Sequence, residues 1–188
     1  MSSKEFGEGL DKAVQKAFTR PAPKSAGAQM RYLVKQLGGT KAVAQKLRVS
    51  QRTVERYVKD QIKKPRPDLA ARLDSEVKRR WQPQIRAKAR QKAATTSGIV
   101  IDVHARLGYA GAPMGTTDED RIRHLTVALP PQHAGRLFDA QQQGAGEDRL
   151  RELAADALRE VYFQDGGRRA GSLQEVQIND VLNLDFGL

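Results

Sequence analysis

The sequence predicts an α+β protein with an N-terminal, all-helical module followed by a smaller module of strands and helices. Apolar residues recur at helical spacing up to about residue 82, and the period changes to two near residue 99. The charge reverses at the same place: residues 1–100 contain 24 Lys and Arg residues against 8 Asp and Glu residues, whereas residues 101–188 contain 9 against 14. Because 188 residues suffice for two small cores, we expect two modules.

Residues 39–59 have the apolar spacing of two helices that cross at a tight corner, and this spacing predicts a helix-turn-helix. The residues expected to face inward are Val43, Ala44, Leu47, Val49, Val54, Tyr57 and Val58. Ser50 is placed to cap the second helix through its hydroxyl. The residues left outside on the second helix are Gln51, Arg52, Thr53, Glu55, Arg56 and Lys59. Such donors and cations suit base edges and phosphates, so this helix is predicted to read DNA; the alternative is an ordinary helical hairpin with solvated charges.

Further helices are expected around this hairpin. Residues 3–18 carry one apolar stripe, ended by Pro21 and Pro23, and we expect this helix to pack on the DNA-binding module. Residues 28–37 open the three-helix core and are followed by Gly38 and Gly39 as a stop signal. A helix over residues 68–81 follows, with Trp81 as a core anchor.

Two basic segments extend the cationic half beyond the hairpin. Residues 63–67 form a connection stiffened by proline, and residues 84–94 carry cations spread too evenly around a helix to leave an apolar face. The second segment predicts an arm that tracks phosphates; a solvated linker is the alternative. The complete set of predicted DNA-binding residues is Lys41, Gln51, Arg52, Thr53, Arg56, Lys59, Lys63, Lys64, Arg66, Arg86, Lys88, Arg90 and Lys92.

The C-terminal module is predicted to begin with two strands, over residues 99–107 and 123–129, in which apolar and polar residues alternate. Residues 108–120 join them as a long, glycine-rich, exposed loop. Helices over residues 133–142 and 147–163 follow, and residues 176–186 have a strand-like composition that returns to the sheet. The predicted domains are therefore an N-terminal helix and linker (1–26), a helix-turn-helix domain (27–82), a basic linker arm (83–97) and an α+β priming or protein-contact domain (98–188).

Composition excludes several classes of function. The chain has no Cys, which removes disulfides, thiolate metal sites and cysteine nucleophiles and fits a reducing compartment. No apolar run approaches the ~20 residues needed to cross a bilayer, so we expect no membrane contact and a cytoplasmic protein. His104, His124 and His133 are not spaced to share one helical face, and the acids at 118–120 point in different directions. We therefore expect no metal site and no intrinsic cofactor.

Three segments carry a resemblance to a known family: residues 115–118 (GTTD), 121–127 (RIRHLTV) and 161–167 (VYFQDGG). Together with the basic helix-turn-helix half, they resemble the telomeric terminal proteins (Tpg type) of linear bacterial chromosomes and plasmids, over most of the chain. The resemblance implies a nucleoid-associated protein joined covalently to the 5′ DNA end through a side-chain hydroxyl. It would prime end-patching DNA synthesis and cap the ends. The implied partners are telomere DNA, a DNA polymerase that supplies the divalent metal, and a telomere-recruiting protein. Whether the chain also pairs with a second copy of itself stays open, and so does its intrinsic enzymatic activity: the resemblance implies a primer and nucleotide acceptor, not an enzyme.

A priming hydroxyl must reach into a polymerase active site, and the loop over residues 108–120 is the segment suited to that. Thr116 and Thr117 are the predicted linkage residues, with Thr117 beside Asp118, and their spacing does not separate them. The hydroxyls at residues 95–97 (Thr95, Thr96 and Ser97) are weaker candidates. Without the resemblance, Thr116 and Thr117 would be assigned a turn or helix-capping role.

A second function class stays open at this point. The chain could be a helix-turn-helix transcriptional regulator, which would act as a dimer that places two reading helices about 34 Å apart on a palindrome. A recombinase is a third class, but no convincing nucleophile constellation supports it.

Overall fold

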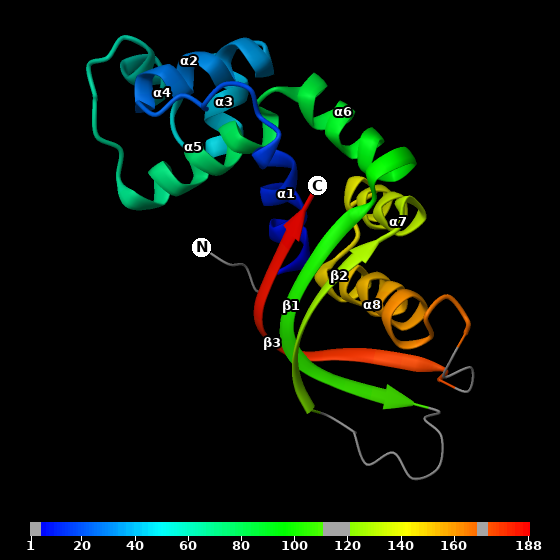
Figure 1. Cartoon of the computed structure of the whole chain (residues 1–188). Coiled ribbons are helices and arrows are strands. Elements are labelled where there is room, and N and C mark those ends of the chain that lie inside the picture. Colours follow the sequence, from blue (N-terminus) through cyan, green and yellow to red (C-terminus); the bar gives the residue numbers. More distant parts are fainter. Residues whose placement is uncertain (1–4, 111–120, 169–172) are drawn as a thin grey trace. The chain divides into compact units, whose positions relative to one another are not determined.

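The computed structural model describes residues 5–110, 121–168 and 173–188, and its fold is α+β as predicted (Figure 1). The chain forms two compact units. Phe18–Pro83 is all helical and is called the helix-turn-helix unit below. Met1–Ala17 and Gln84–Leu188 together make the sheet unit. The helix-turn-helix unit is therefore an insertion in the sequence of the sheet unit, after its first helix.

The helix-turn-helix unit contains α2 (Ala26–Leu37), α3 (Thr40–Leu47), α4 (Gln51–Val58) and α5 (Pro67–Arg80). Its core is one apolar cluster to which all four helices contribute. The fully or nearly fully buried members include Met30, Leu33, Val43, Leu47, Val54, Tyr57, Leu69, Leu73 and Val77. Helix α2 ends at Gly38, whose φ of 77° is the left-handed conformation that glycine adopts at low cost. This stop agrees with the sequence-based prediction.

The two ends of the helix-turn-helix unit are tied together by side chains. The Thr19 amide donates to Oε1 of Gln82 at 3.0 Å, and Nε2 of Gln82 donates to the Thr19 hydroxyl at 3.1 Å. The indole N–H of Trp81 donates to the carbonyl of Arg20 at 2.9 Å, and its ring lies edge-on to Tyr32 with centroids 5.0 Å apart. Trp81 is therefore a structural anchor, but it lies outside the apolar core where the sequence analysis placed it. It fastens the point where the chain leaves the unit to the point where it enters.

The sheet unit contains β1 (Ile99–Ala110), β2 (Arg121–Leu129) and β3 (Glu175–Gly187), antiparallel in the order β2-β1-β3. The return of the C-terminal segment to the sheet is thereby confirmed. The inward residues of β1 alternate as predicted, and all are buried: Ile99, Ile101, Val103, Ala105 and Leu107. Both β1 and β3 curve strongly (Figure 1), and the register between them shifts around Ala105.

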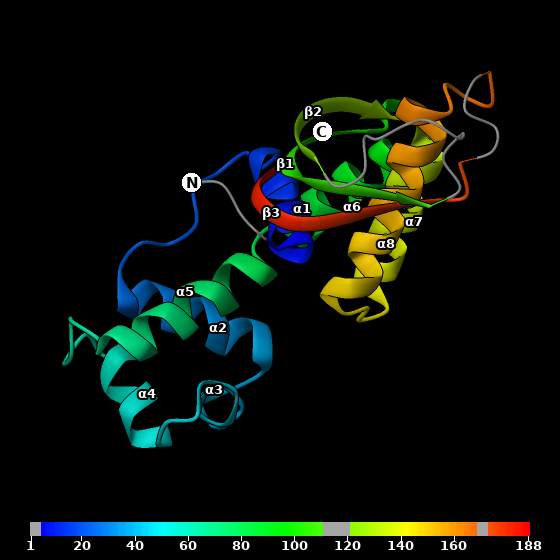
Figure 2. The same cartoon turned by 90° about the horizontal axis from the view of Figure 1, so that it is seen from below.

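Helices α7 (Pro131–Gln142) and α8 (Glu147–Leu158) lie against each other on the buried side of this sheet (Figure 2). The sequence predicts one helix over residues 147–163, but α8 ends at Leu158 and a π-helical turn, η2 (Arg159–Phe163), follows. Every helix within residues 5–110, 121–168 and 173–188 is too short or too polar to span a membrane.

Helix α1 (Phe6–Lys16) corrects one prediction, because it packs on the sheet unit and not on the DNA-binding module. Phe6 meets Phe186 of β3 edge-on, with ring centroids 6.3 Å apart. The carboxylate of Glu147, the first residue of α8, accepts the amide N–H groups of Phe6 at 2.6 Å and Gly7 at 3.0 Å. A carboxylate at a helix N-terminus accepts hydrogen bonds from backbone N–H groups that have no partner in the helix, and it interacts favourably with the positive end of the helix dipole. The apolar stripe of residues 3–18 was visible in the sequence, but its partner was not.

Helix α6 (Pro83–Lys92) and the π-helical turn η1 (Ala93–Ser97) replace the predicted basic linker arm. The prediction of a segment without an inward face was wrong, since Ala93 is fully buried and Ala89 packs against the core of the sheet unit. The error arose from Arg86, whose side chain is only 6% exposed and whose guanidinium lies 2.6 Å from Asp11 of α1. An acidic partner far away in sequence thus lets a cation occupy an inward position.

His133 of α7 gives a prediction for the pH dependence of stability. Its side chain is 3% exposed, and burial holds its pKa below the ordinary 6.5 although Glu160 lies 3.5 Å away. The unfolded chain therefore binds a proton more readily than the folded chain, and the stability that neutral His133 provides is lost as pH falls below about 6.5. Urea unfolding at pH 7.5 and pH 5.5 should show this loss, and His133→Gln should reduce it. The control, His104→Gln, keeps His133 and should lose as much stability between the two pH values as the unmodified chain does. If both variants lose the same amount of unfolding free energy, His133 is not the source of the pH dependence.

Candidate nucleic-acid interface

The corner between α3 and α4 is formed by three residues, Arg48, Val49 and Ser50. Arg48 adopts a left-handed conformation with φ of 53°, which turns the chain sharply after α3. The Val49 amide then donates to the carbonyl of Ala44 at 3.0 Å, and the Val49 side chain packs against the unit's core. These contacts fix the angle between the two helices, as the apolar spacing predicts.

Ser50 caps α4 in the predicted manner. Its hydroxyl accepts the backbone N–H of Thr53 at 3.1 Å and lies 2.8 Å from the Thr53 hydroxyl. The backbone N–H groups at the start of a helix have no partners within the helix, so this contact fixes where α4 begins.

Removing this cap should lower stability measurably. We expect Ser50→Ala to reduce the free energy of unfolding by about 1 kcal/mol, the usual cost of losing a serine cap. Denaturant unfolding followed by circular dichroism measures it. Ser75→Ala, at an exposed position of α5, is the matched control and should change stability much less. A Ser50 variant as stable as the Ser75 variant would show that the cap contributes nothing.

Some side chains on the outer face of α4 form hydrogen bonds within the protein, and others do not form ion pairs with the described residues. Nε2 of Gln51 donates to Glu55 at 2.8 Å, and the Thr53 hydroxyl is engaged with Ser50. The other predicted contacts on this helix are exposed and join no ion pair with any described residue: Arg52, Arg56 and Lys59. Arg52 lies in the first turn of α4, the part of a recognition helix that reaches base edges. It is the strongest candidate for a base contact.

Unpaired cations gather on one stretch of the helix-turn-helix unit. The unit carries 17 Lys and Arg residues against 5 Asp and Glu residues. Three of the unit's carboxylates pair with cations of α2 and α5: Asp60 with Arg31, Asp74 with Lys78, and Glu76 with both Arg79 and Arg80. The cations between α3 and α5 are exposed and form no ion pair with the described part of the chain: Lys41, Lys46, Arg48, Arg52, Arg56, Lys59, Lys63, Lys64 and Arg66. This set is called the cationic surface below, and such a surface favours a polyanion partner.

Sequence reasoning missed two members of this surface, Lys46 and Arg48. Lys46 lies in the last turn of α3, and Arg48 is the left-handed corner residue. The signal for Arg48 was present, because a tight corner between two helices turns at least one side chain outward. The pairs within α5, such as Asp74 with Lys78, are four residues apart or fewer and follow from local spacing. The sequence could not show that Asp60 of the α4–α5 connection neutralises Arg31 of α2 at 2.7 Å.

The remaining predicted site residues lie on the sheet unit or outside the described residues. Arg86 and Arg90 of α6 turn toward Asp11, at 2.6 and 3.6 Å, whereas Lys88 and Lys92 are exposed. The weaker priming candidates at residues 95–97 are exposed hydroxyls on η1. The predicted linkage residues Thr116 and Thr117, and the acids at 118–120, lie outside the residues that the structure describes.

The open face of the sheet carries a polar cluster that sequence spacing did not predict. Register places His104 of β1 opposite His124 of β2, with ring centroids 5.6 Å apart. Asp102 accepts the Thr126 hydroxyl at 2.6 Å and lies 3.0 Å from Nε2 of His124. Both hydrogen bonds lower the pKa of Asp102, and the one from Thr126 has the larger effect. Within the described residues no group of three or more His, Asp or Glu side chains could hold a metal ion.

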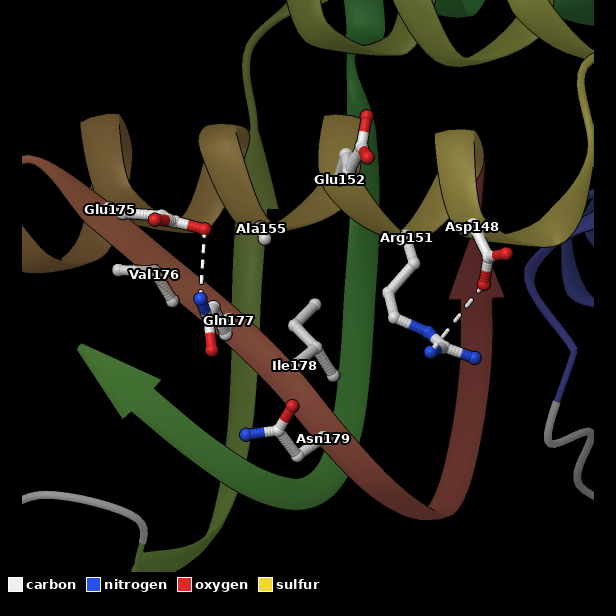
Figure 3. A pocket seen from close by; sticks show the side chains of 9 residues that line it. All are labelled: Asp148, Arg151, Glu152, Ala155, Glu175, Val176, Gln177, Ile178 and Asn179. Atoms are coloured by element: carbon white, nitrogen blue, oxygen red, sulfur yellow. Dashed lines mark hydrogen bonds and ion pairs between the residues drawn. The ribbon is translucent and has the colours of Figure 1, made fainter. Parts of the chain in front are cut away.

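A cavity of about 280 Å³ lies between α8 and β3 (Figure 3). Three carboxylates line it, those of Asp148, Glu152 and Glu175, together with the guanidinium of Arg151. Arg151 is directed toward Asp148 at 3.8 Å, as Figure 3 shows. The excess of negative charge disfavours phosphate, so this cavity is not part of the candidate interface.

In comparisons with known proteins, no family model, curated protein or solved structure matches the chain.

Proposed function

We propose that this chain is a terminal protein of a linear DNA replicon: it binds telomere DNA, accepts the first nucleotide on a side-chain hydroxyl, and stays attached to the 5′ end as a cap. In this proposal the chain is a substrate and primer, acting at the nucleoid, and the polymerase supplies the catalytic metals. The helix-turn-helix unit holds DNA, while the sheet unit meets the polymerase or the telomere-recruiting protein.

One observation carries the DNA-binding part of the proposal. The cationic surface gathers exposed Lys and Arg side chains around a capped helix whose first turn presents Arg52. Guanidinium groups can form paired hydrogen bonds with guanine, and lysines bind phosphates as point charges. The covalent part of the proposal rests on the resemblance of residues 115–118, 121–127 and 161–167 to telomeric terminal proteins.

The priming step is a nucleotidyl transfer. The oxygen of Thr116 or Thr117 attacks the α-phosphorus of a deoxynucleoside triphosphate, so a P–O bond to the protein forms and the α–β phosphoanhydride bond breaks. Pyrophosphate leaves, and the hydroxyl proton passes to a base in the polymerase site. The divalent metals of the polymerase would supply the charge neutralisation that this step needs. The threonine-linked nucleotide then offers its 3′-OH for extension.

Two measurements test the proposal with the unmodified chain. Fluorescence anisotropy should show binding to telomere-derived DNA that weakens steeply with salt, as expected for contacts with phosphates. Incubation with a telomere polymerase, magnesium and one labelled deoxynucleotide should leave label on the denatured protein. DNA binding without labelling would favour the regulator over the terminal protein. Absence of any DNA affinity would overturn the whole proposal.

A further inference from the structure

The outward side of α6 and η1 carries lysines, amides and hydroxyls and no carboxylate. Its exposed residues recur at helical spacing, so that they form one continuous face. They are Gln84, Ala87, Lys88, Gln91, Lys92, Thr95, Thr96 and Ser97. This set is called the lysine face below; α6 and η1 run directly into β1 (Figure 1).

Two of the four cations of α6 point into the protein and two point to solvent. Arg86 and Arg90 turn inward, where they share the carboxylate of Asp11, and the Arg90 guanidinium also lies 5.9 Å from the centre of the Phe138 ring. Lys88 and Lys92 point to solvent and join no ion pair with the described residues. They are one helical turn apart, and like charges at this spacing destabilise a helix slightly. A polyanion bound at this face would remove that repulsion.

The surroundings of the lysine face favour DNA as its partner. Lysine ammonium groups, amides and hydroxyls are the side-chain groups that contact phosphate and sugar. Other parts of the sheet unit carry carboxylates: Asp139 of α7 lines a cavity with Ala87 and Gln91, and α8 and β3 present Asp148, Glu152 and Glu175. Helix α6 also begins at Pro83, which is the last residue of the helix-turn-helix unit. The chain therefore passes directly from the unit that carries the cationic surface to the lysine face.

We propose that Lys88 and Lys92 form a second DNA contact, which binds the sugar-phosphate backbone without reading its sequence. The inference rests on the proposed DNA binding and adds a surface on the other unit to it. Arg86 and Arg90 serve the fold and are not part of this contact. The lysines contribute affinity and salt dependence, whereas the choice of sequence belongs to α4.

The test measures DNA affinity of the full chain against salt concentration. Each neutralised phosphate contributes about 0.9 to the slope of log K against log salt, so Lys88→Gln with Lys92→Gln should reduce that slope by about 1.8. The preference between cognate and random DNA should not change. Lys88→Arg with Lys92→Arg keeps both charges and should retain the slope of the unmodified chain.

The matched control removes two exposed cations from other helices of the same unit, Arg136→Gln on α7 with Arg149→Gln on α8. It should leave the slope unchanged. If the lysine variant and this control have equal slopes while Arg52→Ala still weakens binding, the second contact is wrong but the DNA-binding unit stands; the lysine face would then be free for an acidic protein. If the unmodified chain does not bind DNA, the proposed function and this inference both fall.

Discussion

Replacing Thr116 and Thr117 together by Ala should abolish covalent labelling of the chain by a polymerase and one labelled deoxynucleotide. The methyl group of alanine cannot attack phosphorus, so the loss should be complete and independent of nucleotide concentration. The single variants Thr116→Ala and Thr117→Ala decide which hydroxyl is used, because only one of them should lose the label. Gel electrophoresis after denaturation measures the label, and mass spectrometry places the nucleotide remnant.

The control for this experiment uses the other hydroxyl segment. Thr95, Thr96 and Ser97 are exposed on η1, where Thr95 donates to the carbonyl of Gln91 at 2.8 Å. Their triple replacement by Ala should keep the label. Label that survives in the Thr116/Thr117 variant and disappears in the triple variant would move the linkage to η1. DNA affinity should be the same in the Thr116/Thr117 variant as in the unmodified chain, which separates loss of chemistry from loss of binding.

Arg52→Ala should weaken binding to cognate DNA by about 1–3 kcal/mol, which is roughly 5- to 150-fold, if its guanidinium forms a paired contact with a base. Arg56→Ala should have a similar effect if it also reads a base. It should instead weaken binding equally on all sequences, with a salt slope lower by about 1, if it contacts phosphate. Titrations on cognate and random duplexes distinguish the two roles.

Arg72→Ala is the matched control for these variants. Arg72 is an exposed arginine of the same unit, on α5, where its Nε donates to the carbonyl of Asp68 at 3.3 Å. The control removes the same charge from another helix and should change affinity far less. If Arg52→Ala and Arg56→Ala both bind as Arg72→Ala does, α4 is not the reading helix.

Local patterns predicted most of the elements because their causes are local. The corner at Val49, the cap at Ser50 and the inward alternation of β1 depend on residues a few positions apart, and each is present in the structure. The docking of α1 was not predictable in this way, because it depends on Glu147, 140 residues after Gly7. The prediction that the segment of α6 has no inward face failed for the same reason, since Asp11 is what permits Arg86 to lie inside.

The residues of the candidate site also differ in whether local sequence patterns or contacts between distant residues determine their surroundings. The exposed cations of α4 are predictable from its helical period, because inward and outward positions are set by neighbours in sequence. The hydrogen bond from Gln51 to Glu55 at 2.8 Å spans one turn of α4 and is also local. The ion pair between Arg31 and Asp60 at 2.7 Å crosses the unit, and the sequence did not predict it. The pairing of His104 with His124 needed the strand register, which spacing along one helix cannot reveal.

Backbone amide NMR of the labelled full chain, titrated with telomere-derived DNA, tests the central claim that the cationic surface holds the DNA. Resonances of residues 41–66 should shift first and most strongly, with smaller changes at Lys88 and Lys92, while α8 and β3 keep their free positions. Shifts confined to α8, β3 or the open face of the sheet, with residues 41–66 unchanged, would contradict it.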